Sequence, residues 1–561
     1  MGGSDPVEQT PGWLRAPRTE GALLGAVAIA CLVPFVGKPI HLDDPLFVWT
    51  ARQILKAPLD FYGFDVNWHG FTDVMANANK NPPLTAFYLA AAAALFGFSE
   101  VALHLAMLIP ALAAVLGSWA LARRLCSHPA LAALAMLAMP AFLVSATTLM
   151  ADVVLLACWV WSLFLWWSGL EDGRPARLVA AGGIVGLAIL AKFVAVALLP
   201  LLMAVTWARE RRVDARWLAF AVPVGMFGAY LAFMSGRYGI DLRETVAGYA
   251  FDSRTSSGAN LFRSLAVAAF FAGGSFLSVV AYAPLLWRGR RGAAWLAISV
   301  VGGVVLGSVA GLPVGLNLVS LHAIVFAAGA LALGALLVGE CRHASRGDAA
   351  LLVLWIGGIA IFTVALNWTI NARSLLPAAP AVAIVLVRAL EREPGVRLEG
   401  WRVGAPLAIC LGVSLWVAWG DTRLATEARD AARLLAPAGE RVDDTAGSLW
   451  FEGAWGFQYY MEERGVPKVD AMGSLLRAGD RVVVPLNNTN QWIPPVGVAE
   501  LVEELRRPTG GLVASQSRAH GAGFYSDRYG PLPFVIGVEP VEVYQVYVLG
   551  ATLRLRGHVR E

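Results

Sequence analysis

Long apolar runs follow one another along most of the chain, separated by short polar stretches that are often rich in arginine. A helix needs roughly 17–25 mainly apolar residues to cross a bilayer. The pattern predicts thirteen such helices, at residues 21–37, 100–121, 129–146, 150–168, 177–190, 192–207, 217–234, 264–286, 294–312, 314–338, 349–366, 374–387 and 403–419. The apolar stretch 82–96 is shorter and ends at Gly97, so we expect an interfacial or re-entrant helix there.

Composition agrees with a chain that lies largely in lipid. Of 561 residues, 57% are hydrophobic and only 15% are charged, whereas a soluble protein carries about 25% charged residues. The net charge of +4 is small and its basic residues sit in clusters between apolar runs. Such clusters carry orientation information and do not indicate a nucleic-acid partner. The first run lacks a clear small-residue cleavage site, so we expect a retained helix and not a removed signal peptide.

The distribution of arginine predicts the orientation of the chain. Arginines gather in alternate loops, whereas the short loops between them hold only Lys192 and Arg373. The positive-inside rule then places the N-terminus in the cytoplasm and the C-terminus outside. The predicted organisation is a cytoplasmic segment 1–20, a transmembrane domain 21–420 and an outer, periplasmic domain 421–561.

Three polar pieces are expected on the outer face, at about residues 38–99, 235–263 and from 421 onward. The last piece mixes helical patterns with strand-like runs, which indicates a small α/β domain. The helical patterns are Ala425–Leu435 and Ala499–Arg506, and the strand-like runs are Arg481–Pro485 and Val541–Leu549. The predicted fold class is therefore an all-α polytopic membrane bundle of about thirteen helices that carries a small extracytoplasmic α/β domain.

Three acidic residues are candidates for chemistry. Asp43 and Asp44 follow the first span directly, and adjacent carboxylates at a membrane boundary have raised pKa values that suit a general base. The alternative is a helix N-terminus, because Asp followed by Pro45 is a favourable helix start. Asp152 lies at the outer end of the fourth span, where an ionisable residue is costly and marks a functional candidate. A residue that snorkels from a span end is the alternative for Asp152.

Three cations lie on the same predicted face. Arg373 and Lys192 occupy outer turns, and Lys80 precedes the short apolar stretch at Pro82. A guanidinium matches phosphate oxygens with a planar fork of donors, so together these residues could bind a lipid phosphate. Each alone is more often an interface anchor. Trp49 and Trp68 of the first outer loop are candidates for stacking on a sugar.

Other reaction classes lack a signal. The eight histidines show no HExxH motif and no cluster with cysteine at the spacing of a metal site. There is no Walker A motif and no glycine fingerprint for a dinucleotide. We therefore predict no bound cofactor and no metal site, and leave dependence on a divalent metal open.

Several short motifs occur in an order that resembles the integral-membrane glycosyltransferases of the C fold. The similarity is to the protein O-mannosyltransferase and aminoarabinose (lipid A) transferase group, with its bacterial branch of lipopolysaccharide-core galacturonosyltransferases. It covers most of the chain and is dense over residues 38–200. The motifs are Asp43-Asp44, Pro82-Pro83-Leu84, Phe96-Gly97-Phe98-Ser99-Glu100, Pro140 to Asp152, Gly186 to Lys192, Arg373 to Pro380, and Gly453 to Tyr460.

The resemblance implies roles for individual residues. Asp43 takes the place of the family's catalytic or acceptor-orienting carboxylate, and Asp44 stands where the family usually has Glu. Asp152 matches the second outer-loop acid, and Arg373 matches an arginine near the carrier phosphate. Lys80 stands two residues before the proline, whereas the aminoarabinose transferases have a lysine immediately before it.

The implied function is transfer of a sugar from a polyprenyl phosphate to an envelope acceptor at the periplasmic face of the bacterial inner membrane. The acceptor is a lipopolysaccharide, another glycan, a lipid or a protein, and nucleic acid is not a partner. The alternatives are a secondary transporter or lipid flippase, and a membrane scaffold without catalysis. The enzyme hypothesis requires Asp43, Asp152 and Arg373 to converge at one outer-facing site.

Overall fold

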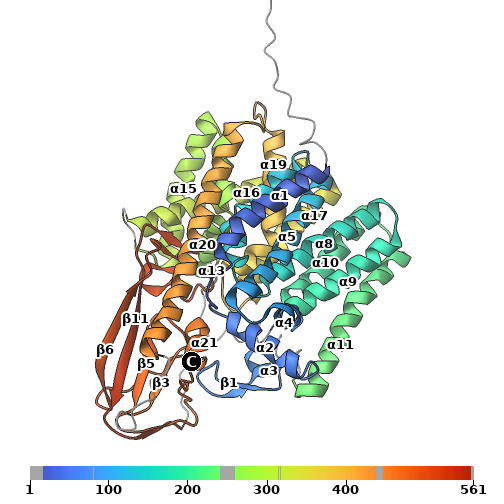
Figure 1. Cartoon of the computed structure of the whole chain (residues 1–561). Coiled ribbons are helices and arrows are strands. Elements are labelled where there is room, and N and C mark those ends of the chain that lie inside the picture. The colour runs from blue at the N-terminus through green and yellow to red at the C-terminus, as the bar shows by residue number, and fades with distance from the viewer. Residues whose placement is uncertain are drawn as a thin grey trace, which may run out of the picture.

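The computed structural model describes residues 17–79, 81–240, 260–313, 315, 317–437 and 447–556. Most of them form a bundle of apolar helices with a β-rich domain at one end (Figure 1). The bundle helices are α1 (Pro17–Leu32), α5 (Glu100–Leu125), α6 (Pro129–Leu137), α7 (Pro140–Ser145), α8 (Asp152–Glu171), α9 (Pro175–Ala191), α10 (Leu198–Glu210), α11 (Ala221–Tyr238), α13 (Leu261–Ser275), α14 (Leu277–Leu286), α15 (Gly289–Ala310), α16 (Leu318–His343), α17 (Arg346–Ile361), α18 (Ala372–Leu375), α19 (Ala379–Arg392) and α20 (Trp401–Leu435).

The span count is lower than predicted. Within the described ranges, ten helices are long and apolar enough to cross a membrane, or up to eleven if one bent pair is a single span. The predicted count of thirteen is therefore not confirmed. The bent pair is α13 with α14, which meet at 78°, and the predicted span 177–190 corresponds to α9, only 17 residues long.

The remaining difference is the predicted span 129–146, which the structure breaks into α6 and α7. Pro140 begins α7, and the residue before it, Met139, is extended, with a ψ of 135°. A proline disfavours the helical conformation in the residue that precedes it. The chain therefore interrupts the helix at this point, although its apolar pattern continues.

The first loop and the C-terminal domain lie together at one end of the bundle. We call this end the domain face. The loop contains α2 (Asp44–Lys56), the hairpin β1 (Asp65–Val66) and β2 (Asp73–Val74), α3 (Met75–Ala78) and α4 (Leu84–Phe96). Ala471 N–H donates to Gly70 O at 2.9 Å, and the Gln458 amide donates to Asn67 O at 2.9 Å. With 13 residues, α4 is about 20 Å long, shorter than the ~30 Å hydrocarbon core, as expected for an interfacial helix.

The C-terminal domain is built on a four-stranded sheet in the order β3-β5-β11-β6. Strand β3 (Leu449–Phe451) is parallel to β5 (Arg481–Pro485), which pairs antiparallel with β11 (Val541–Leu549). The helix α21 (Trp455–Glu462) lies between β3 and β5 in the chain. Smaller strand pairs join β7 (Val513–Ala514) to β10 (Val535–Ile536), β8 (Gln516–Ser517) to β9 (Ala522–Gly523) and β4 (Leu475–Leu476) to β12 (Leu553–Arg554).

Two strand predictions in this domain are confirmed and one helix prediction is wrong. The runs 481–485 and 541–549 form β5 and β11, and Ala425–Leu435 forms the end of α20. The run Ala499–Arg506 forms a strand, β6 (Ala499–Pro508), that pairs antiparallel with β11. Its Glu, Leu and Arg residues favour a helix locally, but pairing with the neighbouring strand outweighs that weak preference. Its exposed charges suit the edge of a sheet.

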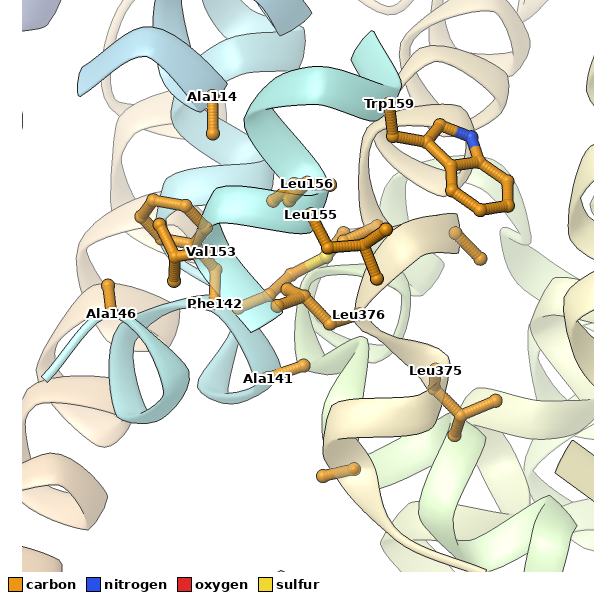
Figure 2. Packing of buried hydrophobic residues seen from close by; sticks show 14 of the residues in the cluster. Ala114, Ala141, Phe142, Ala146, Val153, Leu155, Leu156, Trp159, Leu375 and Leu376 are labelled. Carbon is orange, nitrogen blue, oxygen red and sulfur yellow. The ribbon is translucent and has the colours of Figure 1, made fainter. Parts of the chain in front are cut away.

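Apolar side chains fill the bundle directly beneath the domain face. Figure 2 shows Val153, Leu155 and Leu156 of α8 against Phe142 of α7, with Leu376 close by. All five are fully buried or nearly so. This packing fixes the end of α8 and the segment after residue 373 relative to each other, and so sets the positions of the polar residues above it.

Candidate functional site

Asp43 lies in a tight turn between the first span and α2. Pro45 in the first turn of α2 favours a helix start here, and Asp43 is the N-cap residue. Its side chain makes no capping hydrogen bond, so the carboxylate is free to interact with other groups at the domain face. The preceding residue, Leu42, has a φ of 43°, a left-handed conformation that is uncommon for a residue other than glycine and occurs often at functional sites. The Asp43 side chain is 36% exposed.

Asp44 has a different environment from Asp43. Its carboxylate is fully buried and accepts the N–H of His41 at 3.0 Å and the N–H of Leu149 at 2.8 Å. Burial raises the pKa of Asp44 to about 7, although Lys38 and the two N–H donors act in the opposite direction. Asp44 thus connects the first loop to the turn before α8, and we assign it to positioning.

Asp152, Lys192 and Arg373 form one connected group with Asp43. Asp152 begins α8 and is 2% exposed; its carboxylate lies 2.7 Å from Lys192 Nζ and 3.6 Å from Arg373 Nη1. The other terminal nitrogen of Arg373, Nη2, lies 3.2 Å from the Asp43 carboxylate. Asp43 and Arg373 are 330 positions apart in the sequence, and the fold brings them together. Two carboxylates and two cations therefore alternate across the site.

The C-terminal domain holds the segment that carries Arg373. Ala372 N–H donates to Phe524 O at 2.9 Å. The Asp527 carboxylate accepts the Thr369 hydroxyl at 2.6 Å and the Ile370 N–H at 2.9 Å. The position of Arg373 in the site therefore depends on residues 524–527 of that domain.

A buried polar network lies under the site, and our reasoning from the sequence missed it. Lys38 Nζ lies 2.5 Å from the Asp421 carboxylate, and both side chains are 0% exposed. Asp421 also accepts the hydroxyls of Tyr525 at 2.6 Å and Ser515 at 2.7 Å. The Tyr525 ring centroid is 5.3 Å from the guanidinium carbon of Arg373, so Tyr525 connects the two groups. A lysine directly after the first span, on the arginine-poor side, was the available signal.

The other sequence candidates have separate positions. Trp49 lies 6.2 Å from both Trp68 and Tyr459 between ring centroids, and Trp68 is 7% exposed. Trp49 keeps an accessible surface on a groove treated below. Lys80 falls outside the described residues. Among the described residues, no group of three or more His, Cys, Asp or Glu side chains could hold a metal ion.

Fold and site together define a multi-pass membrane protein with a charged, partly exposed site at the domain face. Residues 80–233 match the family model of dolichyl-phosphate-mannose-protein mannosyltransferases. This match confirms, over that segment, the predicted resemblance to the mannosyltransferases.

Solved structures give a weaker similarity over more of the chain. The structure is similar to that of ArnT from Cupriavidus metallidurans bound to undecaprenyl phosphate, with 19% identity over 84% of this chain and 94% of that chain and a TM-score of 0.45. The Archaeoglobus fulgidus oligosaccharyltransferase tethered to an acceptor peptide gives 13% identity, 82% and 64% coverage, and a TM-score of 0.47. No curated protein sequence matches the chain. Residue roles are therefore assigned from the geometry of this chain.

Proposed function

We propose that this protein transfers a sugar from a polyprenyl-phosphate donor to a hydroxyl of an envelope acceptor. The domain face is then periplasmic, and the N-terminus lies in the cytoplasm. The match of residues 80–233 to a family named for a dolichyl-phosphate sugar supports the donor class. The observation that carries the proposal is the convergence of Asp43, Asp152, Lys192 and Arg373.

The arrangement suits a single displacement at the anomeric carbon. Asp43 accepts the proton of the acceptor hydroxyl, whose oxygen bonds to that carbon as the bond to the carrier phosphate breaks. The sugar configuration inverts, and the electron pair leaves with the phosphate. Because a phosphate is already a good leaving group, the site needs no general acid, whereas glycosidases use one alongside a second carboxylate.

The cations have a defined part in this reaction. Arg373 and Lys192 neutralise the phosphate charge that develops as the bond breaks, an electrostatic stabilisation of the transition state. The Arg373 side chain is 13% exposed at the site, and its buried Nε makes no hydrogen bond within the described structure. Asp152 lies between Lys192 and Arg373 and holds both in place, so we assign it to positioning the cations.

The transporter and flippase alternative is less well supported. Transporters place charged sites near the middle of the membrane, between repeats. Here the convergent charges lie where α8 and α18 begin at the domain face, and residues of the C-terminal domain contact them. A scaffold without catalysis would leave this grouping of charges without a role.

The test is mass spectrometry of envelope glycolipids, glycoproteins and polyprenyl-phosphate sugars from a deletion strain. The strain is complemented with wild type, Asp43→Asn, or Glu500→Gln, a control carboxylate exposed on the edge strand β6. We expect one sugar to disappear from an envelope molecule while its carrier form accumulates. Wild type and Glu500→Gln restore the sugar to the envelope molecule, and Asp43→Asn does not. Full restoration by Asp43→Asn would remove Asp43 from the reaction.

A further inference from the structure

A groove opens on the domain face between the first loop and the C-terminal domain. Its volume is about 390 Å³, within the ~300–1,000 Å³ of small-molecule sites. Nearly all of its lining comes from α2 and the region of the hairpin β1–β2, and α21 contributes Glu462. Its lining residues are Trp49, Arg52, Gln53, Lys56, Phe64, Asp65, Val66, Asn67, Thr72 and Glu462.

The groove lies along the helix that begins at the proposed catalytic residue. Trp49, Arg52, Gln53 and Lys56 occupy positions i, i+3, i+4 and i+7, so they share one face of α2. Asp43 precedes the helix by one residue. At 1.5 Å per residue, Trp49 lies about 9 Å from Asp43 along the helix axis. The groove and the proposed catalytic residue therefore lie on the same helix, with Trp49 at the end of the groove nearer to Asp43.

Trp49, one of the two aromatic residues that line the groove, is held in place by other rings. The Trp49 ring meets Trp68 edge to face, with an interplanar angle of 82°, and lies at 32° to Tyr459. Each ring centroid is 6.2 Å away. A fixed, half-buried indole offers a flat apolar surface beside polar neighbours. The C–H face of a pyranose ring packs well on such a surface.

The charges in the groove are balanced and do not favour a polyanion. Arg52 is already engaged, with Glu463 at 2.5 Å and the Tyr459 hydroxyl at 2.9 Å. Lys56 is exposed, and so is Asp65 on the facing hairpin. Glu462 accepts the Gln458 amide through one oxygen at 2.7 Å. Carboxylate and amide groups hydrogen-bond sugar hydroxyls without requiring a charged partner.

From these observations we infer that the groove binds a neutral sugar unit of a glycan acceptor. The sugar ring stacks on Trp49, and its hydroxyls hydrogen-bond with Asp65, Glu462 and Gln53. This inference rests on the proposed function and narrows its acceptor to a carbohydrate. A peptide acceptor is disfavoured because the described lining offers two partly buried aromatic side chains, Trp49 and Phe64, beside a row of charged and polar groups.

Saturation-transfer NMR on the full chain in lipid nanodiscs tests the inference directly. The probes are neutral disaccharides of glucose, mannose, galactose and N-acetylglucosamine, a glucuronic acid disaccharide, and a serine- and threonine-containing peptide. The variants are Trp49→Ala, Asp65→Asn and Asp43→Asn, with Trp401→Ala as a control because Trp401 is 77% exposed on the bundle. Asp65 is also exposed, so its substitution tests recognition without disturbing the core.

We expect saturation transfer to at least one neutral disaccharide in wild type, Asp43→Asn and Trp401→Ala. Trp49→Ala should reduce it at least tenfold, and Asp65→Asn should reduce it severalfold. Equal signals in wild type and both groove variants would overturn the inference, as would transfer to the acidic disaccharide or the peptide alone. Because Asp43→Asn retains binding while the deletion-strain test measures transfer, failure of the groove and failure of the proposed reaction give different results.

Discussion

The buried pair of Lys38 and Asp421 makes the sharpest prediction about stability. We consider replacing Lys38 with Met, a side chain of similar length without charge. The Asp421 carboxylate then loses the Lys38 ammonium at 2.5 Å and keeps the hydroxyls of Ser515 and Tyr525, with His41 Nε2 at 3.5 Å. Removing one partner of a buried pair costs about 3–5 kcal/mol, because the other charge stays buried without compensation. Two remaining donors place the expected loss near the lower limit, about 3 kcal/mol.

A double-mutant cycle separates the lost pair from lost packing. Asp421→Asn alone leaves the Lys38 ammonium uncompensated and should cost a similar amount. The double variant Lys38→Met, Asp421→Asn contains no buried charge at this position, and its amide still bonds to the Tyr525 hydroxyl. We expect it to lose only about 1 kcal/mol relative to wild type, the size of a weakened hydrogen bond.

The measurement is unfolding of the full chain in mixed micelles by titration with sodium dodecyl sulfate. Two results would refute the reasoning. A loss below about 1 kcal/mol for Lys38→Met would mean that water or another cation compensates Asp421. A double variant as unstable as the sum of the two single variants would mean that the residues act independently.

Three further outcomes are expected. Arg373→Lys loses the planar fork of the guanidinium at the proposed phosphate site, so kcat should fall about 10²–10³-fold. Arg506→Gln, at an arginine exposed on the edge strand β6, should leave kcat unchanged, and purified protein with a polyprenyl-phosphate sugar measures both. Burial holds the pKa of Asp44 at about 7, above its ordinary ~3.9, so the folded state binds this proton more tightly than the unfolded state. The stability that the bound proton contributes at low pH is lost as pH rises from ~3.9 through 7. The thermal midpoint should fall over this pH range in wild type and change less in Asp44→Asn. Gly456→Ala places a Cβ 2.2 Å from Ile40 O and should lower the free energy of unfolding by about 1–3 kcal/mol, measured by the same detergent titration. An unchanged midpoint would show that α21 does not dock closely against Ile40.

The membrane bundle was predictable because its signal is local. Apolar runs of span length and the motifs around Asp43, Asp152 and Arg373 are read directly from the chain. The sequence places Arg373 and both acids on one predicted face, but their pairing also depends on the contacts of residues 369–372 with residues 524–527. The broken span at Pro140 shows the limit, since apolar composition continues across a point where the backbone turns.

Features set by distant parts of the chain were not predictable. The run 499–508 has a helical composition, and only pairing with β11 makes it a strand. The buried group under Arg373 needs the first span and residue 525 in contact, and no local pattern announces that contact. Nor does the Asp43-Asp44 pair reveal which carboxylate is buried, because that depends on the N–H of Leu149.

The hydrogen bonds between residues 369–372 and 524–527 have a consequence for biogenesis. Asp527 follows its partner Ile370 by 157 residues, and a ribosome needs about 8–30 s to add that length at ~5–20 residues per second. During this interval the helices can enter the bilayer, but the segment that carries Arg373 still lacks its hydrogen bonds to residues 524–527. Under the proposed function, the nascent protein is inactive until its last domain has folded onto the bundle. Under the same proposal, half-made copies do not consume the cell's pool of lipid-linked sugar.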